Sequence, residues 1–156
     1  MTAGIDRASV RLRAGTPADI PRFAELIAGA QLPPLFIAEY IAGFVAAEHG
    51  DEIVACGGLE MYEQYGVIRS VVVVEPARGL GLGAALADRL ESDARALGAT
   101  DIYLFTADAL EFWRRRGYTE VTFDDWAMPA RLCWQYQFIT QNEDLVGVAH
   151  PMWRKA

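Results

Sequence analysis

Apolar and polar residues alternate over residues 9–14, and this period of two predicts a strand with one solvated face. Helical spacing follows Thr16, which starts a capping pattern, and it ends near Gly29. Two prolines break the chain before residues 35–41, which we expect to form a short second helix. This second helix either covers the core or forms one wall of a substrate cleft.

The middle of the chain has the pattern of β-strands. Apolar runs at residues 44–48 and 52–61 flank a Gly-Asp turn and predict a β-hairpin. Gly57 and Gly58 interrupt the second run, which indicates a bulge or a close approach by another backbone. Residues 66–74 are nearly all apolar at their end, as expected of a strand covered on both faces.

Helical and strand patterns alternate in the second half of the chain. We expect a helix over residues 81–97, with Leu97 on its buried face and Glu91 on its solvated face. The later elements follow as a strand at 101–106, a helix at 107–116, a strand at 118–123, a helix at 129–139, a polar loop at 141–144 and, because of Pro151, an edge strand at 145–153. This order predicts an α+β fold with mixed strand pairing, in a single domain over residues 1–156.

The sequence RGLGLG at residues 78–83 lies between the strand at 66–74 and the helix that follows. A helix N-terminus presents backbone N–H groups and a partial positive charge. Gly79, Gly81 and Gly83 lack the Cβ atoms that would hold a phosphate away from those groups. The stretch therefore predicts a cradle for a phosphate or pyrophosphate group.

Composition and charge narrow the range of partners. The chain is 53% hydrophobic and 22% charged, as in globular proteins, and its net charge of −7 argues against a nucleic-acid surface. No apolar run reaches the roughly 18 residues of a membrane span, and residues 1–8 lack the apolar core of a signal peptide. Cys56 and Cys133 are too few and too far apart for a metal cluster, and we expect both to be buried thiols. These features predict a cytoplasmic protein without a metal, a membrane partner or a nucleic-acid partner.

The glycine-rich stretch resembles a known signature. Arg78, Gly81 and Gly83 match the acetyl-CoA motif of the GCN5-related N-acetyltransferase (GNAT) superfamily: arginine or glutamine, two variable residues, glycine, one variable residue, then glycine or alanine. Residues 109–118 resemble the later helix and closing Gly-aromatic pair of that superfamily, and residues 10–19 resemble its first strand and helix. The arsenic-resistance and amino-acid acetyltransferase branch is similar at residues 58–60, 68–70 and 104–107.

The resemblance implies a GNAT-like fold, with a mixed, mostly antiparallel sheet of about six or seven strands flanked by about four helices. It implies that an acetyl group moves from acetyl-CoA to the primary amine of a small, amino-acid-like molecule. An acetyl-CoA-binding sensor or interaction module without turnover is the alternative. By this resemblance the cofactor contacts Val71, Val73, Arg78, Gly79, Leu80, Gly81, Leu82, Gly83, Ala84 and Thr106. The backbone N–H of Val73 is then the expected donor to the oxyanion.

The sequence departs from the usual catalytic residues of this superfamily. Trp113 stands where many members have the tyrosine that protonates the thiolate, and Val67 stands where histone-modifying members have a catalytic glutamate. Glu60 is a candidate base, and the alternative is an ordinary solvated carboxylate at the end of a strand. His49 and His150 are lone histidines that we do not expect to be catalytic.

Arg69 lies in the middle of an apolar strand, where an unpaired guanidinium would be costly. Its partner is either the carboxylate of a substrate or a protein carboxylate, Glu60 or Glu63. We therefore take Arg69 as a candidate substrate-binding residue. Three aromatic residues near the end of the chain are candidates either for covering the substrate or for a homodimer contact: Trp126, Trp134 and Trp153.

Overall fold

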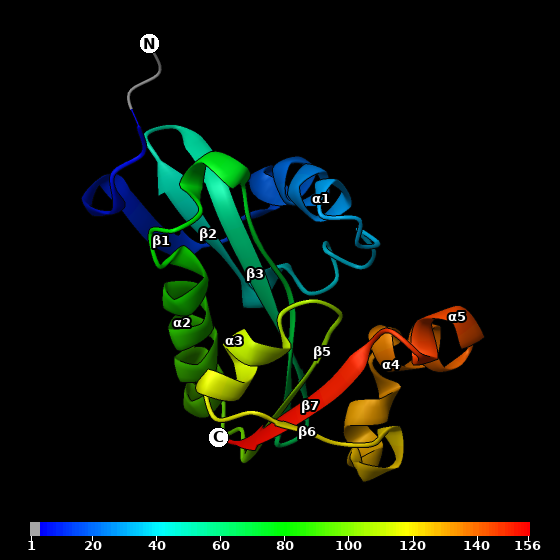
Figure 1. Ribbon diagram of the computed structural model, residues 1–156. Coiled ribbons are helices and arrows are strands. Elements are labelled where there is room, and N and C mark those ends of the chain that lie inside the picture. The colour runs from blue at the N-terminus through cyan, green and yellow to red at the C-terminus, as the bar shows by residue number, and fades with distance from the viewer. Residues whose placement is uncertain (1–3) are drawn as a thin grey trace. The chain divides into compact units, whose positions relative to one another are not determined.

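The computed structural model describes residues 4–156 and shows a mixed α/β protein (Figure 1). Seven strands of these residues form one sheet in the order β1-β2-β3-β4-β5-β7-β6. The strands are β1 (Val10–Ala14), β2 (Phe44–His49), β3 (Glu52–Tyr62), β4 (Tyr65–Val73), β5 (Asp101–Thr106), β6 (Thr119–Glu120) and β7 (His150–Lys155). The α-helices are α1 (Ile20–Gly29), α2 (Leu82–Ala96), α3 (Leu110–Arg115), α4 (Trp134–Thr140) and α5 (Glu143–Val146).

The strands of this sheet pair in both directions. Strands β4 and β5 pair in parallel, whereas β1 with β2, β2 with β3, and β7 with both β5 and β6 pair antiparallel. The predicted α+β class with mixed pairing is confirmed.

The chain divides into two compact units. Unit 1 contains the residues up to Leu59 together with Ser70–Asp93, and unit 2 contains Glu60–Arg69 and Ala94–Ala156. Strands β3 and β4 and helix α2 each contribute residues to both units. The single domain over residues 1–156 stays a prediction.

In unit 1 the predicted first strand and helix are both present. The capping pattern at Thr16 is confirmed, because its backbone N–H donates to Asp19 Oδ2 at 2.8 Å at the entrance to α1. Two nitrogens of Arg13 in β1 donate to the same carboxylate at 2.7 and 2.9 Å. The cap therefore also ties the helix to the first strand. From α1, Phe23 packs its ring against Phe44 of β2 at 5.3 Å.

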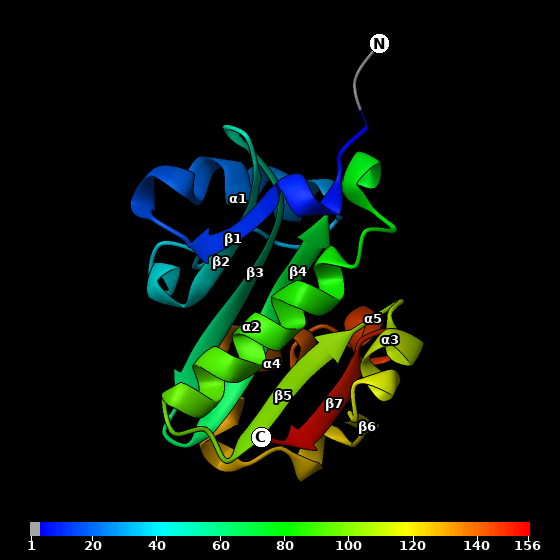
Figure 2. The ribbon, with the colours of Figure 1, turned by 90° about the vertical axis from the view of Figure 1, so that its left-hand side faces the viewer.

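The predicted hairpin is confirmed, and its two glycines mark close approaches by side chains rather than by another backbone. A Cβ on Gly58 would lie 2.8 Å from the Phe44 ring, and one on Gly57 would lie 2.9 Å from Leu90 Cδ1 of α2. Because neighbouring residues of a strand point to opposite faces, α1 covers one face of the sheet in unit 1 and α2 covers the other (Figure 2). The register shift of this hairpin lies elsewhere, at Ala47 and Glu48.

Residues 35–41 are not the predicted second helix. They form turns that lead into a single 3₁₀ turn, Ile41–Gly43. Phe36 has φ +58°, a left-handed conformation that an α-helix cannot contain. Ile37 is buried with residues of α1, so this segment does cover the core, which was one of the two expected roles.

Helix α2 is confirmed, but the predicted exposure of two residues, Leu97 and Glu91, is wrong. Leu97 is 64% exposed because the helix ends at Ala96 and the chain turns off through Gly98 at φ +90°. Glu91 is buried, on the same row of the helix as Ala87 and Ala94. Ala87 and Ala94 make the buried face of the helix wider than the row of leucines from which the exposure was predicted.

In unit 2, the prediction of an edge position for the last strand is wrong. Strand β7 lies between β5 and β6 (Figure 2), and the edge strand is β6. The Val121 N–H donates to the Pro151 carbonyl at 2.9 Å, whereas proline has no N–H to return the bond. The two-residue β6 ends beside this proline, so an interior strand can hold it.

Strand β5 has its predicted bounds, whereas several other elements of unit 2 are shorter than predicted. The strand expected at 118–123 consists of two residues, and the helix expected at 129–139 is a 3₁₀ helix, Met128–Leu132, followed by α4. Helix α3 is confirmed in a shorter form, and α5 occupies part of the expected polar loop. An aromatic cluster takes up much of the core here: Tyr103, Trp126 and Tyr136 are buried with partly buried aromatic neighbours around them. Stacking among these rings fixes the irregular segment between β6 and β7 without long regular elements.

Candidate functional site

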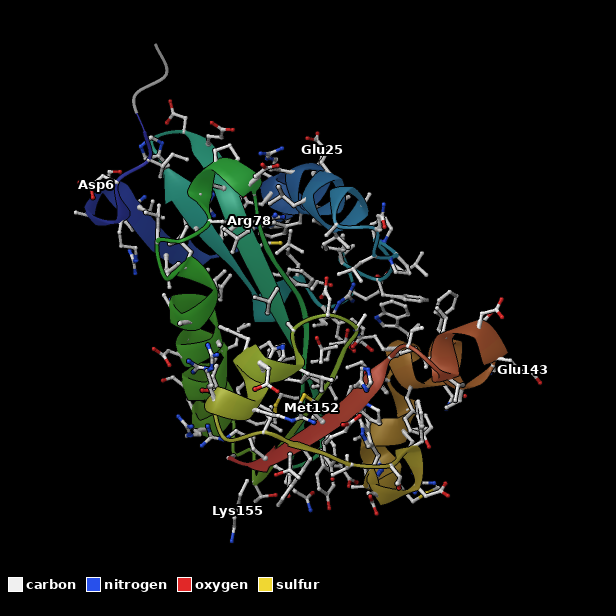
Figure 3. The ribbon with its side chains drawn as sticks, in the orientation of Figure 1. Asp6, Glu25, Arg78, Glu143, Met152 and Lys155 are labelled. Carbon is white, nitrogen blue, oxygen red and sulfur yellow. The ribbon has the colours of Figure 1, made fainter. Side chains whose placement is uncertain are left out.

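The predicted phosphate cradle is a connection between β4 and α2 in unit 1. Gly79 and Gly81 have φ +80° and +78°, and neither would meet another atom within 4 Å if it carried a Cβ. Arg78, labelled in Figure 3, donates from Nε to the Val73 carbonyl at 3.1 Å. The Ala85 N–H donates to the Gly81 carbonyl at 3.0 Å and opens the ladder of α2.

The residues of this loop present their backbone rather than their side chains. The N–H groups of Leu82, Gly83 and Ala84 precede the first intrahelical bond and lie at the positive end of the helix dipole. The side chain of Leu82 is buried, so only its backbone can meet a ligand. The structure therefore brings the predicted loop residues together at one helix N-terminus.

Strand β4 contains an irregularity that the sequence pattern did not reveal. Ser70 has φ +57°, which is uncommon for any residue other than glycine and is typical of a bulge. Its carbonyl accepts a long hydrogen bond of 3.6 Å from the Cys56 thiol. Val71 and Val73, the predicted contacts of the cofactor's arm, follow directly and are half-buried.

The parallel ladder between β4 and β5 is short. It joins Tyr65, Gly66 and Val67 to the first three residues of β5, whereas the pairing of β5 with β7 continues to Thr106. Thr106 is buried, and its hydroxyl oxygen accepts the Ala109 N–H at 3.0 Å where α3 begins. Thr106, a predicted cofactor contact, thus also holds the turn that leads into α3.

Trp113, which stands in the place of the usual acid, is a core residue. It is 6% exposed and lies edge-on to both Phe112 and Tyr118, with ring centroids 4.9 and 5.2 Å away. Packing of this kind accounts for a tryptophan at this position without a role in proton transfer.

Arg69 and Glu60, one of the partners expected for it, form an ion pair. In unit 2, Arg69 Nη1 of β4 lies 3.0 Å from Glu60 Oε2 of β3, and both side chains are 0% exposed. The Tyr62 hydroxyl donates to the other Glu60 oxygen at 2.5 Å. The expectation of a solvated Glu60 is therefore wrong, and a protein carboxylate provides Arg69 with the partner that its burial requires. Glu63 lies exposed in the β3–β4 turn.

The three tryptophans near the end of the chain have different environments. The Trp134 ring lies over the Arg69 guanidinium, with the central carbon 5.0 Å from the ring centroid. Trp126 is a core residue, 1% exposed. Trp153 donates its indole N–H to Asp101 Oδ1 at 2.8 Å. Of the three, Trp134 is the one that adjoins a predicted site residue.

Both cysteines are buried and free, as predicted. Cys133 precedes α4, and its sulfur accepts the Tyr136 N–H at 3.4 Å. Burial raises the pKa of the Cys133 thiol to about 12. A thiol that stays protonated near neutral pH is a poor nucleophile, so this residue serves packing and helix capping.

The histidines do not join a metal-binding group within residues 4–156. His150 Nδ1 lies 2.6 Å from Glu120 Oε2, and the second oxygen of that carboxylate is 3.4 Å from Arg114. Over the same residues, no three His, Cys, Asp or Glu side chains are grouped closely enough to hold a metal ion. In this described part of the chain, every helix is too short or too polar to cross a membrane.

A strand, a glycine loop and a helix N-terminus in direct succession define a class of α/β proteins that hold phosphate-bearing ligands through backbone N–H groups. The chain belongs to the acetyltransferase (GNAT) family, whose family model matches residues 19–118. This match runs from the start of α1 through the glycine loop to the residue after Gly117. The family predicted from Arg78, Gly81 and Gly83 is confirmed.

Curated relatives are similar over about half of this chain. An amino-acid acetyltransferase of Mycobacterium tuberculosis is 37% identical over 87 residues, which are 53% of this chain and 49% of the relative. An amino-acid acetyltransferase of Ralstonia nicotianae is 29% identical over 99 residues, 62% of this chain and 22% of the relative. The chain thus matches about half of the first relative's length and about a fifth of the second's.

Solved structures share the fold over nearly the whole chain. A Mycobacterium tuberculosis protein in complex with CoA has a TM-score of 0.76 at 24% identity, over 94% of this chain and 99% of that one. The N-acetylglutamate synthase of Neisseria gonorrhoeae, complexed with coenzyme A and N-acetyl-glutamate, has a TM-score of 0.79 at 21% identity, over 94% of this chain and 35% of that one. At these identities the likeness shows the fold, and the expected GNAT-like fold is confirmed.

Proposed function

We propose that this protein is an N-acetyltransferase that moves the acetyl group of acetyl-CoA to the primary amine of a small, amino-acid-like molecule. The observation that carries the proposal is the geometry of the glycine loop, in which Gly79 and Gly81 take left-handed conformations ahead of the first turn of α2. Membership of the GNAT family and the names of the curated relatives support the reaction and the class of acceptor.

In this proposal the loop holds the cofactor's pyrophosphate. The backbone N–H groups of residues 78–84 face the phosphate oxygens, and Arg78 adds a positive charge at the start of the loop. Val71 and Val73 bind the cofactor's amide-bearing arm by strand-like hydrogen bonds. Thr106, at the end of the strand after the loop's helix, stays a further predicted contact of the cofactor.

The transfer requires a neutral amine, support for the oxyanion and a proton for the departing thiolate. The amine nitrogen attacks the thioester carbon, the oxyanion collapses and the bond to sulfur breaks. We assign the oxyanion support to the Val73 N–H and the proton acceptor to Glu60, reached through the hydroxyl of the half-buried Tyr62. Because an indole does not donate its proton near neutral pH, water replaces Trp113 as the donor to the thiolate.

We further propose that Arg69 contributes to acceptor binding. Its guanidinium and the adjoining Glu60 form the buried charge pair of unit 2, and an amino acid carries the matching charged groups. A cytoplasmic location and a homodimer stay predictions of the sequence.

Two measurements test the proposed function. Calorimetric titration with acetyl-CoA measures cofactor binding, and release of free CoA thiol over a panel of amino acids, polyamines and aminoglycosides measures transfer. We expect acetyl-CoA to bind and amino acids to give the fastest thiol release. The protein's two cysteines are buried, so they should contribute little background in a short assay.

The outcomes of these measurements separate the alternatives. Tight acetyl-CoA binding without thiol release for any amine would favour a sensor or interaction module without turnover. Absence of acetyl-CoA binding would overturn both functions. Glu60→Gln should change the pH dependence of kcat/KM if Glu60 is the proton acceptor, and an unchanged profile in a folded variant would remove it from that role.

A further inference from the structure

We propose that Trp134 determines acceptor specificity by covering Arg69, and that the preferred acceptor is an amino acid with one carboxylate and an apolar side chain. This inference rests on the proposed function and narrows its class of substrate. In the bound state the acceptor carboxylate takes the place of the Trp134 ring at the guanidinium, and the apolar side chain packs against that ring.

Arg69 is buried beneath the Trp134 ring. Its side chain is 0% exposed, while the Trp134 ring covers the guanidinium at 5.0 Å. Trp134 is half-buried and is the first residue of α4, which has seven residues. It belongs to the irregular connection between β6 and β7, and the preceding Leu132 is 72% exposed. Because Arg69 is fully buried, a carboxylate in solution can reach it only when neighbouring side chains move, and Trp134 is the side chain to which the proposal assigns this movement.

The charge of Arg69 is already balanced by a protein carboxylate. The ion pair of Arg69 and Glu60 has no net charge, and Tyr62 already donates to the second Glu60 oxygen. Arg131, another arginine of this region, binds the Trp126 and Asp124 carbonyls and lies over the Tyr136 ring. An acceptor with a second carboxylate would bring a further negative charge beside a pair that is already neutral. Such an acceptor is disfavoured by repulsion from Glu60.

An apolar surface continues from Trp134 along α4. The Phe138 ring lies 6.0 Å from the Trp134 ring, one turn further along α4, and it is 37% exposed. Two aromatic rings at this spacing offer a surface for an aliphatic or aromatic side chain. Trp134, which covers the guanidinium, and Phe138, which extends the apolar surface, thus belong to the same helix.

Steady-state kinetics with matched acceptors tests the proposal. Wild-type protein should have a higher kcat/KM for leucine, methionine and phenylalanine than for glutamate or for the corresponding amino-acid amides. Trp134→Ala should lower kcat/KM for these large apolar amino acids by about 10- to 100-fold, the loss expected for an apolar contact, and should change it little for glycine. Trp134→Phe, which keeps an aromatic ring, should recover most of the loss.

Chemical modification provides a readout that does not depend on activity. Phenylglyoxal labels accessible arginines, and peptide mass spectrometry identifies the labelled site. Arg69 should resist labelling in the wild type and should become labelled in Trp134→Ala. Leu132→Ala, the loss of an exposed apolar side chain two residues away, should leave Arg69 protected and the acceptor preference unchanged.

The outcomes distinguish this inference from the proposed function. If no amine is acetylated, the proposed function fails. If amines are acetylated but glutamate is preferred to leucine, or if Trp134→Ala lowers kcat/KM equally for glycine and phenylalanine, the specificity role of Trp134 is overturned alone. Labelling of Arg69 in the wild type would show that the ring does not cover it.

Discussion

Gly81 shows at the scale of one residue why the glycine loop has its composition. Its φ of +78° is costly for residues with a Cβ, yet the protein itself leaves open space where that Cβ would lie. Internal packing therefore does not explain the missing side chain, whereas the left-handed backbone does, and in the proposed function the open space admits a ligand to the backbone. Gly50 in the β2–β3 turn has a similar φ of +61° and equally open surroundings, but it lies outside the loop.

Gly81→Ala should abolish acetyl-CoA binding, because the added Cβ meets the phosphate, and should lower the free energy of unfolding by about 1–2 kcal/mol through backbone strain. Titration calorimetry and urea denaturation measure the two effects. Gly50→Ala should lose the same stability and keep full binding. If both variants bind acetyl-CoA normally, the phosphate site lies elsewhere.

At the scale of elements, strands β3 and β4 are joined in unit 2 by a buried ion pair. Glu60 and Arg69 come from neighbouring strands, and Tyr62 completes the hydrogen bonding of the carboxylate. Either charge, buried without the other, would lower the stability of the fold, so each residue needs the other as its ion-pair partner. The apolar pattern of β4 indicated that Arg69 needs a partner, but the register between the strands decides which partner it has.

Arg69→Met should destabilise the protein by about 3–5 kcal/mol, because it leaves the Glu60 carboxylate buried without its cation. Adding Glu60→Gln should recover part of that loss, since the amide oxygen can still accept the Tyr62 hydroxyl. A double-mutant cycle in urea denaturation measures the coupling. Additive losses would show that the two charges do not interact in the folded protein.

At the scale of the whole molecule, acidic residues outnumber basic residues, and some of the carboxylates are held in fixed ion pairs or hydrogen bonds that lower their pKa. The Arg13 guanidinium and the Thr16 backbone lower the pKa of Asp19 from its ordinary 3.8 to about 2. Hydrogen bonds from Arg13 and Arg11 lower the pKa of Glu48, and those from Thr122 lower that of Asp125. A carboxyl group whose pKa is lower in the folded state stabilises the fold above its unfolded pKa.

Stability should therefore fall as the pH drops from about 4 towards about 2, and Asp19 alone should account for about 2 kcal/mol of the loss. Asp19→Asn should be less stable than wild type at pH 7 and should show a shallower decline in acid. Thermal unfolding over a pH series measures both. Asp51→Asn, at an exposed position of the β2–β3 turn, is the control and should follow the wild-type curve. An Asp19→Asn curve parallel to that of the wild type would contradict the assignment.

The sequence by itself determined the local features of this protein. Strand and helix periodicity, the Thr16 cap, the glycine loop and the family all follow from neighbouring residues, because hydrophobic spacing and backbone preferences act over a few positions. The sequence could not reveal the left-handed Ser70, whose conformation a serine rarely adopts, or the interior position of β7.

The tertiary structure decided which distant residues meet. Glu60, Arg69 and Trp134 are brought together by strand register and by the irregular segment before β7, and neither follows from local pattern. Register and loop packing depend on long-range contacts, whose free energy is settled only when the whole core forms. For this reason the glycine loop could be predicted from neighbouring residues, whereas the sequence left the partner of Arg69 open between a substrate carboxylate, Glu60 and Glu63 until the fold brought Glu60 to it.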